Sequence, residues 1–211
     1  SGTFVVKAPS PSSSVQPPPS PLPPMDAFKK GITFADWVPF DRPPRPTPLY
    51  YPVMADQALK NLAATGANWI MLIVTNGQET IVSTNITRNQ YATASDQALR
   101  HMVDLAHSLG MRVMLRPQIR LSNDPTHSWI DIGAAFTSEE QWQAWFASYR
   151  EFINYYAAFA QDAGVDILVI GDELSSTTHR ENDWRRVIAG VRERFKGPIT
   201  YSSIGGLPSA P

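Results

Sequence analysis

The chain has 211 residues, of which 43% are hydrophobic and 18% charged, and its formal net charge is −1. This length suits one domain with a tail, and the lack of a basic surplus argues against a nucleic-acid partner. No apolar run approaches the roughly 20 residues that a membrane span needs. The sequence contains no cysteine, which excludes disulfides, a thiolate nucleophile and cysteine metal ligands.

Residues 1–28 are predicted to form an extended arm or linker outside the folded domain. Residues 9–24 are nearly all proline and serine, a composition that favours polyproline II and cannot bury a core. The preceding patch at residues 3–7 is either a disordered terminus or a strand that docks on a neighbouring domain. Because such spacers are common in exported proteins, an extracellular or cell-surface location is expected.

From Lys29 onward, buried strands are predicted to alternate with amphipathic helices. Short apolar runs bounded by turn signals indicate strands at residues 31–37, 69–75, 113–117 and 199–202, and a fourth in chain order within 166–174. Apolar residues at helical spacing indicate helices at 55–65 and from 184 to 195. Two further helices are expected between capping boxes, Thr93-x-x-Asp96 and Thr137-x-x-Glu140, and the terminating residues Gly110 and Gly164.

This order predicts an α/β fold with a parallel sheet, since a glycine closes a helix shortly before a strand at Gly66, Gly110 and Gly164. Both a doubly wound sheet and a (β/α)8 TIM barrel satisfy the pattern. No glycine-rich phosphate loop follows the first strand, which favours the barrel. Five βα units fall short of the eight that a barrel needs. Residues 29–211 are therefore expected to form an incomplete TIM barrel, which a second chain could complete.

Polar side chains gather where the predicted strands end, and in a barrel these ends meet on one face. Glu173, after the apolar run 167–170, is the candidate catalytic residue; the alternative is a structural carboxylate paired with Arg116 or Arg180. The candidate substrate-binding residues are Trp37, Asn76, Arg116, Gln118, Asp172 and Tyr201. The sequence shows no histidine or carboxylate cluster with metal-ligand spacing, so neither a metal nor another cofactor is expected.

Amides, a cation and aromatic faces suit a neutral, hydroxyl-rich ligand such as a sugar. A glutamic acid with a raised pKa can protonate a glycosidic oxygen, and a retaining glycosidase needs a second carboxylate about 5–5.5 Å away. Asp172 is the nearest in sequence, but neighbouring strand residues are expected to point to opposite faces. Asp36 is a weak alternative, so no partner carboxylate is identified in the chain.

Several segments together resemble glycoside hydrolase family 113, a family of (β/α)8-barrel endo-β-mannanases and their relatives. The resemblance covers about residues 29–203 and is carried by Gly31-Ile-Thr-Phe with Trp37, residues 106–117, Trp145-Phe-x-x-Tyr149, Ile170-Gly-Asp-Glu-Leu174 and residues 184–201. It implies a retaining mechanism with Glu173 as acid/base and a nucleophilic glutamate at the end of strand seven, which this chain does not contain. Asp172 departs from the asparagine that often precedes the acid/base in the wider clan.

Two functional hypotheses follow. In the first, the chain is part of a glycoside hydrolase that cleaves a β-linked, mannan-like polysaccharide. In the second, it is a non-catalytic carbohydrate-binding or cell-surface assembly module built on a barrel fragment. The polar residues at the strand ends favour the first hypothesis, and the shortage of strands favours the second.

Overall fold

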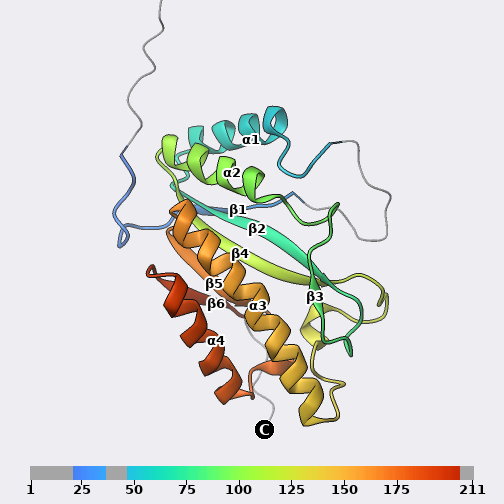
Figure 1. Ribbon diagram of the computed structural model, residues 1–211. Coiled ribbons are helices and arrows are strands. Elements are labelled where there is room, and N and C mark those ends of the chain that lie inside the picture. Colours follow the sequence, from blue (N-terminus) through green and yellow to red (C-terminus); the bar gives the residue numbers. More distant parts are fainter. Residues whose placement is uncertain (1–20, 37–46, 205–211) are drawn as a thin grey trace, which may run out of the picture.

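The computed structural model describes residues 21–36 and 47–204, which form an open, curved sheet with its helices packed along one side (Figure 1). The strands are β1 (Gly31–Phe34), β2 (Trp69–Gln78), β3 (Ile86–Thr87), β4 (Arg112–Leu121), β5 (Ile167–Asp172) and β6 (Ile199–Ser202). The α-helices are α1 (Pro52–Ala64), α2 (Asp96–Ser108), α3 (Glu139–Ala163) and α4 (Glu181–Arg194). Short 3₁₀ turns, η1 (Trp129–Asp131) and η2 (Ser175–Thr177), follow β4 and β5.

The sheet confirms the predicted βα repeat. Its strand order is β1-β2-β4-β5-β6, all neighbours on this path are parallel, and each predicted strand is present. Within the described residues the strands form the incomplete barrel that the sequence predicts. The short strand β3, which pairs antiparallel with the end of β2, was not predicted. Strands β2 and β4 also run longer than expected, because they pair from Trp69↔Arg112 as far as Gln78↔Leu121.

Alternation along the strands divides the sheet into a helix side and an open face. On the helix side, the core cluster takes Ile70, Leu72 and Val74 from β2 and Val113, Leu115 and Ile119 from β4. The intervening residues therefore point to the other face, which we call the open face. It carries Met71, Ile73 and Thr75 of β2 and Met114, Arg116, Gln118 and Arg120 of β4.

Helix α3 lies along the sheet on the helix side (Figure 1). It buries a row of aromatic residues there. Three of these donate buried hydrogen bonds to the sheet, each 2.8 Å long: Trp145 Nε1 to Gln78 Oε1, Tyr149 Oη to the Ile170 carbonyl, and Tyr156 Oη to Asn76 Oδ1. Apolar burial alone tolerates some sliding, whereas these directional bonds fix α3 relative to both β2 and β5.

The helix ends confirm the predicted glycine stops and correct the predicted caps. Gly66, Gly110 and Gly164 all have left-handed φ angles between 72° and 83°, a backbone conformation that costs glycine little. The N-caps are Ser95 and Ser138, not Thr93 and Thr137. The Thr93 hydroxyl instead donates to the Thr75 carbonyl at 2.7 Å, which ties the loop before α2 to the end of β2.

The described part of the N-terminal arm contacts the opposite end of the sheet from Glu173. Arg112 Nε, at the start of β4, donates to the Pro23 carbonyl at 2.5 Å. Asn68, just before β2, accepts from the Lys30 amide and donates to the Phe28 carbonyl. The strand-like patch 3–7 lies outside the described residues. Among the described helices, none is both long and apolar enough to cross a membrane.

We predict that Tyr156→Phe lowers the free energy of unfolding by about 1–3 kcal/mol, because it leaves the buried Asn76 carbonyl oxygen without its donor. Tyr155→Phe is the matched control, since the neighbouring Tyr155 is 43% exposed and bonds Asp96 at the surface. Chemical denaturation of both variants measures the difference. Equal losses would show that the Tyr156 bond does not stabilise the fold.

Candidate active site

Glu173 stands at the point where β5 ends, in an unusual backbone conformation. Its φ angle is 55°, a left-handed value that costs a non-glycine residue of order 1 kcal/mol and often marks a functional site. Its amide donates to the Ser202 carbonyl at 2.8 Å and its carbonyl accepts from the Ser175 amide at 2.9 Å. These two bonds hold the turn, and the Glu173 side chain remains partly exposed.

Trp129 and Arg120 orient the Glu173 carboxylate. The indole Nε1 of Trp129, in η1, donates to Glu173 Oε2 at 3.0 Å. The Arg120 guanidinium lies 3.3 Å from the centre of the Trp129 ring, which is a close cation–π contact. Arg120 Nη2 also donates to Gln118 Oε1 at 3.3 Å, and Gln118 Nε2 donates to Thr75 Oγ1 at 2.8 Å. A continuous polar row thus joins the ends of β2, β4 and β5.

Asp172 has a separate partner. Asp172 is 3% exposed, and its carboxylate forms an ion pair with Arg116 of β4. Burial raises the pKa of Asp172, the charge of Arg116 opposes this, and the charge of Glu173 adds to it. Burial likewise lowers the pKa of Arg120, while the charges of Asp172 and Glu173 oppose that shift. The four charged groups therefore lie within electrostatic reach of one another.

These contacts correct the expectation that Asp172 and Glu173 point to opposite faces. Asp172 reaches Arg116, and Glu173 reaches the indole stacked on Arg120; both arginines project from the open face of β4. Strict alternation fails because the pairing of β5 with β6 shifts register between Val169 and Asp172, and Glu173 then takes its left-handed conformation. The alternative role of Glu173, as a structural carboxylate paired with Arg116 or Arg180, is not seen among the described contacts. Arg116 pairs with Asp172 instead, and Arg180 pairs with Glu139 and Asp183.

The structure brings together Arg116, Gln118, Asp172 and Glu173, but not all of the predicted site residues. Asn76 lies on the helix side, where it is 4% exposed and accepts from Tyr156. Tyr201 packs against Trp184 of α4, with ring centres 5.6 Å apart, and burial raises its pKa to about 12. The Asp36 carboxylate accepts a hydrogen bond from the Tyr50 amide at 2.6 Å. Trp37 lies outside the described residues.

Two residues of this site, Trp129 and Arg120, were not predicted from the sequence. Arg120 carried a usable signal, because it continues the two-residue alternation of Arg116 and Gln118 past the predicted end of its strand. Trp129 carried only the weaker signal of a large aromatic residue outside the predicted helices. Within the described ranges, no group of three or more His, Cys, Asp or Glu side chains could hold a metal ion.

Comparisons with known proteins relate the fold of the chain to one family. The family model for Glycoside Hydrolase Family 113 matches residues 47–204. A solved GH113 beta-1,4-mannanase complex is 27% identical and aligns with a TM-score of 0.70 over 83% of this chain and 55% of its own. The GH113 beta-mannanase AaManA from Alicyclobacillus acidocaldarius, in complex with ManMIm, is 28% identical with a TM-score of 0.70, over 83% of this chain and 54% of its own. No curated protein matches. The chain thus spans about half the length of these solved structures.

We predict that Arg116→Met lowers the free energy of unfolding by about 3 kcal/mol at pH 7, because it leaves Asp172 as a buried, unpaired carboxylate. The pKa of Asp172 is already raised, and losing Arg116 raises it further. The loss of stability in Arg116→Met is largest at a pH where Asp172 is ionised in both the folded and the unfolded chain. It becomes smaller as the pH falls through the raised pKa of Asp172 in the folded variant.

Denaturant unfolding of Arg116→Met at pH 7 and pH 4 measures this dependence. Arg185→Met is the control, because the Arg185–Glu181 pair is exposed and contributes little. A deficit of equal size at both pH values would contradict a role for Arg116 in holding the Asp172 charge.

Proposed function

Because the chain belongs to glycoside hydrolase family 113, we propose that it carries the acid/base half of an active site that hydrolyses a β-linked, mannan-like polysaccharide with retention of configuration. The observation that carries the proposal is Glu173, a partly exposed carboxyl group at a parallel strand end, oriented by Trp129. Catalytic groups of parallel barrels sit at this end of their strands.

In the first step, the Glu173 carboxyl group donates its proton to the glycosidic oxygen as the bond from that oxygen to the anomeric carbon breaks. A second carboxylate attacks the same carbon and forms a glycosyl ester. In the second step, the Glu173 carboxylate accepts a proton from water as the water oxygen displaces the ester. The Trp129 indole can donate a hydrogen bond but cannot accept one. It therefore holds the Glu173 carboxyl group in position in both steps without taking up the proton that Glu173 transfers.

The second carboxylate is proposed to come from a strand end that completes the barrel, in a second chain or in further sequence. Asp172 does not suit this role, because its carboxylate is buried and paired with Arg116. The Asp36 carboxylate also has a partner, because it accepts a hydrogen bond from the Tyr50 amide.

The substrate class rests on charge balance and on the named structural neighbours. Two arginines and two carboxylates offset each other around the strand ends, so the site suits a neutral, hydroxyl-rich ligand. The solved neighbours are described as β-mannanases. An extracellular or cell-surface location is part of the proposal, because a polymeric substrate is degraded outside the cell and residues 9–24 have the composition of a spacer.

We predict that Glu173→Gln lowers kcat on β-mannan by about 100- to 10,000-fold in the complete domain, because the amide cannot donate the proton that the leaving oxygen needs. Binding of manno-oligosaccharides is expected to persist. The loss should be much smaller in the bond-breaking step of a dinitrophenyl mannoside, whose leaving group needs no proton. Unchanged turnover of the polymer would refute the acid/base role, and binding without turnover in the unsubstituted protein would favour the carbohydrate-binding module.

We predict that Trp129→Phe lowers kcat on the polymer by about tenfold with little change in KM, since it removes one hydrogen bond to a charged group, about 1.5 kcal/mol, and keeps an aromatic ring under Arg120. Trp142→Phe is the matched control, because Trp142 also lies beside an arginine, Arg180, but is on α3. Equal effects of the two substitutions on kcat would exclude a positioning role for Trp129.

A further inference from the structure

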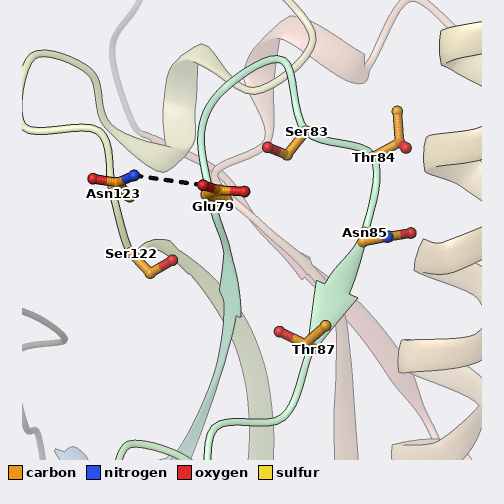
Figure 2. Close-up of a pocket in the computed structure, with 7 residues that line it drawn as sticks. All are labelled: Glu79, Ser83, Thr84, Asn85, Thr87, Ser122 and Asn123. Carbon is orange, nitrogen blue, oxygen red and sulfur yellow. Dashed lines mark hydrogen bonds between the residues drawn. The ribbon is translucent and has the colours of Figure 1, made fainter.

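A polar groove lies beyond the ends of β2 and β4, outside the carboxylate site. It has a volume of about 640 Å³ and is lined by Glu79, residues 83–85, Thr87, Ser122 and Asn123 (Figure 2). The loop from β2 to β3 forms one wall, and the two residues that follow β4 form the other. Because β2, β4 and β5 are parallel, the groove and Glu173 lie at the same end of the sheet.

The groove continues the open face. Glu79 follows Thr75 and Gly77 in the alternation of β2, and Ser122 follows Gln118 and Arg120 in that of β4. Thr87 pairs directly with Gly77 across the antiparallel ladder and therefore points to the same side. The row of polar side chains that leads from Glu173 through Arg120 to Gln118 thus extends into the groove lining.

Hydrogen bonds to neighbouring segments hold the walls of the groove in place. The fully buried Gln78 side chain donates to the Thr80 carbonyl at 2.8 Å while it accepts from Trp145 of α3. Ser148 Oγ, also on α3, accepts from the Ile86 amide at 2.9 Å. Beyond β4, the Asn123 amide donates to the Glu79 carbonyl at 2.9 Å. Preorganised walls of this kind reduce the entropy lost when a ligand binds.

The chemistry of the lining points to a neutral, hydroxyl-rich ligand. Its side chains are hydroxyls, amides and one carboxylate, which match the donors and acceptors of sugar hydroxyls. No cationic side chain is among the described lining residues, so a phosphate group would lack a counter-charge. Asn123 Nδ2 lies 3.4 Å from Glu79 Oε1, a long contact that leaves the carboxylate available to a ligand (Figure 2).

We propose that this groove is a distal subsite for the polysaccharide chain whose scissile bond lies at Glu173. The inference rests on the proposed function, because it takes the ligand to be the same polymer. In the strand order, β2 is two positions from β5, with about 4.8 Å between neighbouring strands. Strand β4 therefore separates the groove from Glu173, so a single sugar unit bound at Glu173 does not fill the groove and a chain of several units is needed to span both regions.

The test is a titration of the protein with two probes, β-1,4-mannotriose and β-1,4-mannohexaose, followed by NMR of the backbone amides. The protein is produced in a bacterial host without N-glycosylation, because Asn85-Ile86-Thr87 is a glycosylation sequon in the groove wall. We expect both probes to shift resonances near Glu173, and only the hexaose to shift those of residues 83–87, 122 and 123.

Glu79→Ala is expected to weaken hexaose binding by about three- to tenfold, the equivalent of one solvent-exposed hydrogen bond of ordinary strength, and to leave triose binding unchanged. Glu151→Ala is the matched control, since Glu151 is an exposed carboxylate on α3 outside the groove. Ser122→Ala, a second lining variant, should act in the same direction with a smaller effect.

Hexaose shifts confined to the surroundings of Glu173, with no effect of Glu79→Ala, would overturn the distal subsite and leave the proposed function intact. Absence of any shift with either probe would overturn both. Equal weakening of triose and hexaose binding in Glu79→Ala would also overturn the subsite, because Glu79 would then act on the sugar-binding face as a whole.

Discussion

The buried hydrogen bonds between helix α3 and the sheet are the constraint on which both functional regions depend. Tyr149 bonds the Ile170 carbonyl, immediately before Gly171-Asp172-Glu173, and so fixes where β5 turns. Trp145 bonds Gln78, whose amide in turn holds the loop that walls the groove. One rigid helix therefore sets the positions of the acid/base candidate and of the distal groove, although they lie on different strands.

The two adjacent carboxylates differ because their surroundings differ. Asp172 is buried against Arg116, which offsets the cost of its charge and removes it from contact with solvent. Glu173 is partly exposed, and its described side-chain contact is a neutral donor, the Trp129 indole. A group that transfers a proton to substrate must be reachable by it, whereas the Asp172 carboxylate is enclosed by the sheet and by its partner Arg116. The proposed division of roles follows from these environments.

Much of the fold was predictable from the sequence, and the candidate site only in part. Local signals fixed the alternation of strands and helices and the glycine stops at Gly66, Gly110 and Gly164, because each depends on a few neighbouring residues. The side on which a polar residue faces depends instead on strand register. Asn76 was expected to bind the sugar, but its position in the alternation of β2 places its side chain on the helix side, where it bonds Tyr156. Trp129 comes from a loop, and no local pattern encodes its contact with Glu173.

Tyr201 has an indirect part in the site. A Cβ atom at Gly171 would lie 2.4 Å from the Tyr201 ring and 2.9 Å from that of Trp184, so only glycine lets β5 pass this close to both. Ile170 and Gly171 consequently both face the helix side, and the register with β6 shifts before Asp172. That shift turns Asp172 towards Arg116 on the open face, beside Glu173. The aromatic ring that the sequence suggested for sugar contact thus acts from behind the sheet, by shaping the backbone that brings the two carboxylates together.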